Sequence, residues 1–163
     1  MKPKLLAASA ALILVACSEP PVDPMVRGAE LLAPFKLELK NALVGGMQNG
    51  PATAIEVCSD KAPEIAASLS VDGVAMGRSS HKLRNPDNAP PAWLELSDKP
   101  VVVDLGNGRH GYAEPIFAQP LCLTCHGEEL APDIAVQIEA LYPDDQATGF
   151  SEGDLRGVFW VEF

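Results

Sequence analysis

The pentapeptide Cys122-Leu123-Thr124-Cys125-His126 is the segment whose residue types and spacing most clearly carry chemistry. C-x-x-C-H is the attachment signature of c-type haem. The two thiols form thioethers with the haem vinyl groups, and the adjacent imidazole binds the iron from the same side. This spacing works because both sulfurs must reach one edge of a flat macrocycle while the imidazole points at its centre. One motif predicts one covalently bound haem, with His126 as its proximal ligand.

Three other interpretations of these residues stay open. Cys122 and Cys125 could form a thioredoxin-like dithiol, although the flanking sequence lacks the expected βαβ pattern. They could hold zinc together with His126, although a structural zinc site needs a fourth ligand and typically a second paired motif. They could also form a disulfide across a loop. The sequence favours haem attachment, because the pentapeptide is its specific signature and the dithiol and zinc interpretations each lack part of their usual pattern.

A ligand on the opposite face of the haem would decide the function, because the axial ligands set both the potential and the access to iron. The available donors are Cys58, Met47, Met76, His81, His110 and Met25. Methionines at helical or alternating spacing more often fill a core, and His110, beside a predicted turn, is expected in solvent. Cys58 has no assigned partner and shares an apolar helix face with Ile55, so burial and iron ligation both remain open.

Arg78, Lys82 and Arg84 form a cationic cluster in an acidic chain, with no Asp or Glu between Arg78 and Arg84. Haem propionates gain from charge-assisted hydrogen bonds, and arginine binds a carboxylate through two parallel bonds. Arg78 and Arg84 are therefore candidate propionate ligands, with a solvated loop as the alternative. Asp145 has the character of a turn residue.

Residues 1–16 have the pattern of a secretory signal peptide. Lys2 and Lys4 precede an apolar run of about 12 residues, which is shorter than the roughly 20 needed to span a bilayer. The sequence from Leu14 to Cys17 resembles a bacterial lipobox, which predicts cleavage before Cys17 and lipidation of that residue. An ordinary signal peptide that contains a cysteine is the alternative.

The Pro-rich residues 17–24 would then form a tether between the lipid and a domain over residues 25–163. We expect this domain to face the periplasm. The outer membrane is favoured because Ser18, rather than Asp, follows the lipidated cysteine.

The length of 163 residues predicts one domain. Apolar residues at 47% and charged residues at 21% exclude a disordered or collagen-like chain. The net charge is −10, and removal of Lys2 and Lys4 makes it 10 − 22 = −12. This charge argues against nucleic-acid binding, which needs a basic face, and predicts a redox partner protein that has a basic face.

The hydrophobic pattern predicts helices over residues 25–47 and 131–142, with two shorter helices beginning at Pro51 and Pro63. Strands are expected over 74–80, 101–103, 109–117 and 155–163, with a hairpin turn at Gly106-Asn107-Gly108. About four strands, mostly antiparallel, with helices at the start and near the end, predict a single α+β domain.

The sequence resembles a family of PAS-like haem c domains. The matching stretches are residues 54–58 (AIEVC), 77–80 (GRSS), 84–88 (RNPDN), 122–127 (CLTCHG), 142–150 (YPDDQATGF) and 153–157 (GDLRG). The resemblance implies a PAS-like antiparallel sheet with flanking helices and haem c held by Cys122 and Cys125. It also implies an axial pair of His126 and Cys58.

The expected function is that of a monohaem c-type lipoprotein that transfers single electrons or reports redox state in the cell envelope. Two axial protein ligands would leave no site for a substrate, so we do not expect an enzyme. The alternative is a haem-based sensor of redox state or of CO or NO, because a thiolate ligand can be displaced. Weak peroxidase activity would require an open distal face with an acid–base residue such as His81.

Overall fold

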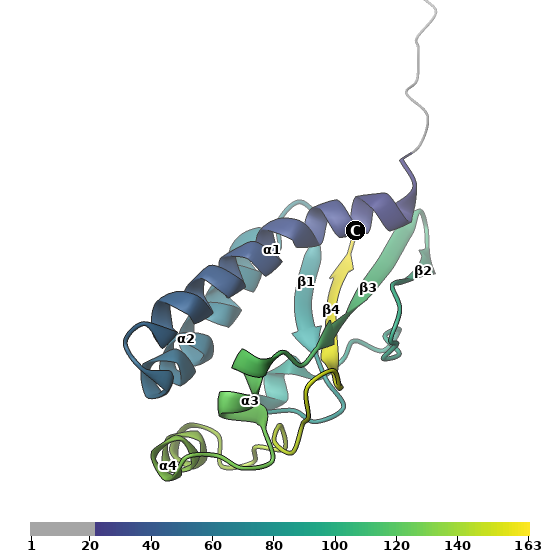
Figure 1. The fold of residues 1–163 in the computed structure, drawn as a ribbon. Coiled ribbons are helices and arrows are strands. Elements are labelled where there is room, and N and C mark those ends of the chain that lie inside the picture. Colours follow the sequence, from purple (N-terminus) through teal and green to yellow (C-terminus); the bar gives the residue numbers. More distant parts are fainter. Residues whose placement is uncertain (1–21) are drawn as a thin grey trace, which may run out of the picture.

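The computed structural model describes residues 22–163 (Figure 1). Cys17, its predicted lipidation and the predicted signal peptide therefore lie outside the described residues. Among residues 22–163, no helix combines the length and the apolar character needed to cross a membrane.

Two long helices, α1 (Pro24–Met47) and α2 (Pro51–Leu69), lie side by side along the molecule (Figure 1). The prediction of two short helices after residue 50 is wrong, because α2 continues through Pro63. Pro34 likewise lies within α1. Both prolines are exposed, so the carbonyl that each leaves without an N–H partner can be hydrated.

The sheet contains β1 (Ala75–Ser79), β2 (Val101–Gly106), β3 (Arg109–Phe117) and β4 (Leu155–Glu162). All neighbouring strands are antiparallel, in the order β1-β4-β3-β2. The predicted hairpin joins β2 to β3 through Asn107 and Gly108, whose φ angles of 55° and 76° are the positive values that a two-residue turn requires. A 3₁₀ turn, η1 (Pro86–Asn88), lies in the long connection between β1 and β2.

Alternating side chains give the sheet two buried faces. On one face, Leu32 and Phe35 of α1 pack against Met76, Tyr112 and Val161, which come from three strands. Leu94, in the connection between β1 and β2, packs with Ala113 and Val158 on the other face.

Helix α1 lies very close to the sheet at Gly28. A Cβ atom at this position would lie 2.3 Å from a ring carbon of Tyr112. A glycine is therefore needed here for the helix to approach the sheet.

Helices α3 (Pro120–His126) and α4 (Pro132–Leu141) lie together beyond one end of the sheet (Figure 1). Ile134 and Ile138 of α4 pack against Ile55 of α2. The sequence pattern predicted α4 but not α3. The predicted fold class, a single α+β domain with an antiparallel sheet and flanking helices, is confirmed.

Candidate functional site

A cavity of about 410 Å³ lies between α1, α2, α3 and the adjacent end of the sheet. This volume falls within the roughly 300–1,000 Å³ of small-molecule and cofactor sites. All six residues that the sequence assigned to a haem site line it: Cys58, Arg78, Arg84, Cys122, Cys125 and His126. The fold thus brings side chains from α2, β1, the segment after β1 and α3 to one place.

Helix α3 carries the C-x-x-C-H motif. It begins with Pro120 in its first turn and ends at His126. The spacing of three places Cys122 and Cys125 on the same side of this helix, and both thiols are unpaired. Two adjacent thiols and an imidazole therefore form one wall of the cavity.

A backbone carbonyl holds the His126 imidazole through a hydrogen bond to Nδ1. Its Nδ1 lies 2.6 Å from the carbonyl oxygen of Ala147, so Nδ1 carries the proton and donates it. Burial, aided by the positive charges of Arg156 and Arg84, lowers the pKa of His126 to about 2. The ring is therefore neutral, and its Nε2 lone pair can bind a metal.

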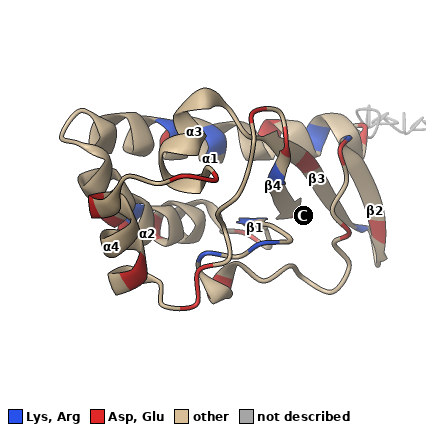
Figure 2. Ribbon diagram, turned by 60° about the horizontal axis from the view of Figure 1, so that its bottom comes forward, with Lys and Arg blue, Asp and Glu red and all other residues tan. Residues whose placement is uncertain are grey.

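The cavity wall is strongly cationic, although the chain is acidic. Its charged residues are Lys36, Lys40, Arg78, Lys82, Arg84 and Arg156, with no Asp or Glu among the lining residues. These make up half of the chain's 12 Lys and Arg, against 22 Asp and Glu. In Figure 2, basic segments lie on α1, β1, β4 and the segment after β1, whereas acidic segments lie on α4, β2, β3 and outer loops. Lys36 is paired with Glu114 and Arg84 with Asp145, so the remaining cations, Lys40, Arg78, Lys82 and Arg156, are the ones that favour an anionic group in the cavity.

Arg156 is the clearest unsatisfied cation of this wall. Its Nε is buried and has no hydrogen-bond partner, and its guanidinium carbon lies 5.0 Å from the centre of the Phe150 ring. Burial, together with the charges of Arg78 and Arg84, lowers the pKa of Arg156 to about 10. Such a group fits an acidic partner such as a carboxylate of a bound cofactor.

The sequence analysis did not identify Arg156. Its position in the family-like stretch 153–157 (GDLRG) was the available signal. Because Arg156 is far from Arg78 and Arg84 in the sequence, their proximity in the fold could not be predicted.

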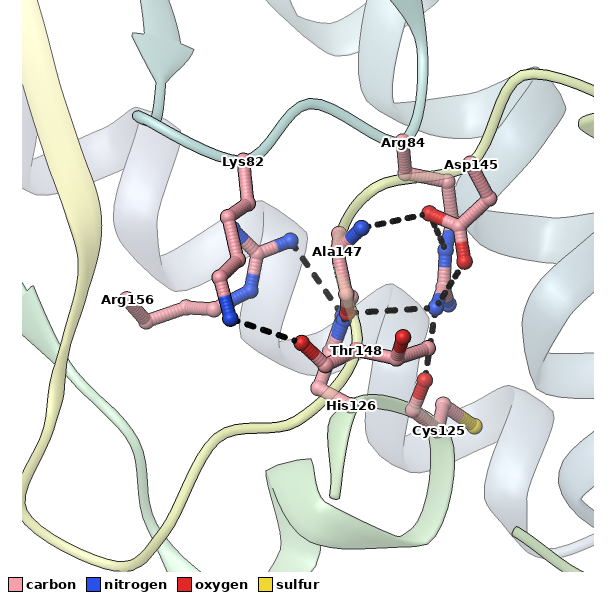
Figure 3. A network of polar contacts seen from close by, with 8 residues as sticks. All are labelled: Lys82, Arg84, Cys125, His126, Asp145, Ala147, Thr148 and Arg156. Atoms are coloured by element: carbon pink, nitrogen blue, oxygen red, sulfur yellow. Dashed lines mark hydrogen bonds and ion pairs between the residues drawn. The ribbon is translucent and has the colours of Figure 1, made fainter. Parts of the chain in front are cut away.

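Arg84 is already bonded to the protein (Figure 3). Its Nε and Nη2 each donate to the carboxylate of Asp145 at 3.1 Å, and Nη2 also donates to the carbonyl oxygen of Cys125 at 2.6 Å. Arg78 forms no ion pair with an acidic residue in the described part of the chain. Of the two predicted propionate ligands, Arg78 thus has the guanidinium that is more available.

The six candidate distal donors differ in their access to the cavity. Cys58 and Met47 line it, whereas His81, His110, Met76 and Met25 do not. Met76 is buried in the core, as expected. His110 is only partly exposed: its Nδ1 is buried and its ring centre lies 5.8 Å from that of Phe163, so the expectation that it lies in solvent holds only in part.

Cys58 is half-buried on α2. Burial raises the pKa of its thiol, and the charges of Arg78 and Arg84 partly oppose this effect. Cys58 also lines a second, smaller cavity of about 250 Å³.

Two of the three alternative interpretations, the disulfide and the zinc site, find little support in the described residues. Within residues 22–163, Cys122 and Cys125 form no disulfide. Over the same range, no group of three or more His, Cys, Asp and Glu side chains has an arrangement that could hold a metal ion. Zinc binding by Cys122, Cys125 and His126 thus lacks a complete set of donors there.

Comparisons with known proteins give two matches. A family model described as Tll0287-like matches residues 19–163. Among solved structures, that of the cyanobacterial haem protein Tll0287 is similar, with a TM-score of 0.57 and 25% sequence identity over 87% of this chain and 96% of that chain. A search of curated proteins found no match.

Proposed function

The chain belongs to the Tll0287-like family, and on this basis we propose that it binds one haem c covalently and passes single electrons or reports redox state in the cell envelope. The observation that carries the proposal is the shared cavity. Its wall combines the two thiols and imidazole of α3, a further thiol on α2 and a cationic surface without acidic residues.

Each part of the site has a role in holding haem. Cys122 and Cys125 would supply the sulfurs for two thioether bonds, and His126 would bind the iron through its neutral Nε2. Cys58 would supply a second iron ligand, while Arg78 and Arg156 would bind the propionates through charge-assisted hydrogen bonds. Bound haem iron supplies one-electron chemistry between its ferric and ferrous states.

A thiolate ligand supports a low reduction potential, because its negative charge stabilises ferric iron. With His126 and Cys58 both bound, no coordination position stays open for a substrate. This arrangement favours electron transfer over catalysis.

The cellular setting follows from the sequence. The lipobox-like residues 14–17 support a lipoprotein anchored through Cys17 and facing the periplasm, with the outer membrane favoured. The net charge of −10 supports a partner with a basic face. Association with that partner should weaken as ionic strength rises.

A sensor of redox state or of CO or NO is the second candidate. The second cavity favours it, because Cys58 is among the residues that line both cavities. A ligand with such space can leave the iron and admit a small molecule.

Optical spectra of residues 18–163, produced together with the haem c maturation proteins, test the proposed function. We expect low-spin, six-coordinate spectra in the ferric and ferrous states that do not change with CO. A high-spin ferrous form that binds CO would favour the sensor. A chain that takes up no haem would contradict both functions.

A further inference from the structure

A salt bridge behind His126 connects two segments far apart in the sequence. Arg84 and Asp145 form it through two bonds of 3.1 Å, and their side chains are only 12% and 9% exposed. Ion pairs this well shielded from water interact more strongly than surface pairs. The two parallel bonds also fix the orientation of the two side chains relative to each other. Arg84 follows β1, whereas Asp145 follows α4.

This pair bonds to two backbone groups near His126, one on Cys125 and one on Ala147. Arg84 Nη2 donates to the carbonyl oxygen of Cys125 at 2.6 Å, directly before His126 in the chain. Asp145 Oδ1 accepts from the backbone N–H of Ala147 at 2.9 Å, and the carbonyl oxygen of Ala147 accepts from His126 Nδ1 at 2.6 Å. The bonds form a closed ring (Figure 3).

We propose that the Arg84–Asp145 pair positions His126, holding its imidazole in one orientation and in the tautomer protonated at Nδ1. The inference rests on the proposed function in taking His126 as the iron ligand. It assigns Arg84 to His126 rather than to a propionate, and it gives Asp145 a role beyond that of a turn residue.

Other contacts hold the same segment without this pair. The N–H of Phe150 donates to the carbonyl oxygen of His126 at 3.0 Å, and Lys82 Nζ donates to the carbonyl oxygen of Thr148 at 3.1 Å. Loss of the pair should therefore loosen Ala147 and His126 without unfolding the segment.

Two substitutions separate positioning from simple charge effects. Asp145→Asn removes a negative charge but keeps an oxygen for the N–H of Ala147. Arg84→Gln removes a positive charge and leaves the Asp145 carboxylate negatively charged. Asp144→Asn is the matched control, because Asp144 is an exposed neighbour outside the ring.

The first test uses the haem-free chain and long-range ¹H–¹⁵N spectra of its histidines. The chain has three histidines, so His126 can be assigned by one substitution. We expect a single Nδ1–H tautomer of His126 in the native chain and in the Asp144→Asn variant. Arg156 Nη2, 3.5 Å from Nε2, favours the same tautomer in every variant, so Asp145→Asn and Arg84→Gln should each add a detectable second signal from the Nε2–H tautomer rather than replace the first. A single Nδ1–H tautomer in either variant would overturn the proposal.

The second test measures the reduction potential of the haem-loaded chain. A hydrogen bond from Nδ1 increases the electron donation of a histidine ligand, so loss of the ordered bond should raise the potential. Both Asp145→Asn and Arg84→Gln should therefore raise it. Shifts of opposite sign would mean that the pair acts only through its charges, and would overturn positioning.

The two tests also separate this inference from the proposed function. If the native chain takes up no haem, the proposed function fails, while the tautomer spectra still decide whether the pair positions His126.

Discussion

Arg156 Nη2 lies 3.5 Å from Nε2 of His126, the imidazole nitrogen that faces away from the Ala147 carbonyl. A buried cation thus lies beside Nε2, the nitrogen that we propose as the iron ligand. Arg156 comes from β4 and His126 from α3, so this relationship depends on the tertiary fold.

Replacement of Arg156 by Gln should lower the reduction potential of the haem-loaded protein. A cation in the haem site destabilises the ferric state, whether it pairs with a propionate or lies nearer the iron, and its loss should favour that state by an amount on the order of 1–2 kcal/mol per electron. A redox titration followed by optical absorption measures this shift. Lys99→Gln is the control, because Lys99 is exposed and lies outside the cavity. Equal shifts in the two variants would contradict a local role for Arg156.

Replacement of Cys58 by Ala should raise the potential and open one coordination position. The thiolate that stabilises ferric iron is lost, so the ferrous variant should become high-spin and bind CO. Met47→Leu is the matched control, since Met47 is the other distal donor that lines the cavity. If Met47→Leu opens a coordination position and Cys58→Ala does not, Met47 rather than Cys58 is the second iron ligand.

Gly28→Ala should destabilise the domain by roughly 1–3 kcal/mol, as for overpacked cores. The added Cβ would lie 2.3 Å from the Tyr112 ring, and the helix or the ring must move. Gly45→Ala in the same helix meets nothing within 4 Å and should stabilise it by up to about 1 kcal/mol. Urea unfolding of both variants measures the difference, and similar effects would contradict the close approach of α1 to the sheet.

Stability should fall as the pH rises through about 10 to 12. Burial, with a hydrogen bond to Glu114 and the charge of that carboxylate, raises the pKa of Tyr112 to about 12, whereas an unfolded tyrosine titrates near 10. The unfolded chain therefore binds fewer protons in this window, and stability present below pH 10 is lost above it.

The Tyr112→Phe variant has no such phenol and should lose less stability over the same pH range. The difference should be on the order of 2 kcal/mol. Unfolding free energies measured at several alkaline pH values test this prediction. Parallel curves for the two proteins would contradict it.

Local patterns in the sequence were enough to predict the fold class. Alternating residues marked the strands, and Gly106-Asn107-Gly108 marked the hairpin that joins β2 to β3. The continuous helix α2 was missed because a proline usually begins or breaks a helix. Its tolerance of Pro63 depends on which face of the helix meets water, and that is decided by tertiary packing.

The site was predicted only in part. The C-x-x-C-H motif and Cys58 could be found because they are short, local signals or lie in family-like stretches. Arg84 was identified as part of the site, but its bonds to Asp145 and the Cys125 carbonyl depend on a pairing across 61 residues. The proximity of Arg156 to His126 likewise depends on how β4 lies against α3, and no spacing in the sequence reports it.

The central claim is that Cys122 and Cys125 bind one haem covalently. Intact-mass measurement of the denatured protein, after production with the haem c maturation proteins, tests it most directly. We predict a mass increase of one haem in the native chain, retained after acid–acetone extraction, and no increase in a Cys122→Ser/Cys125→Ser variant. A native chain whose haem is removed by extraction, or whose mass shows no haem, would contradict the claim.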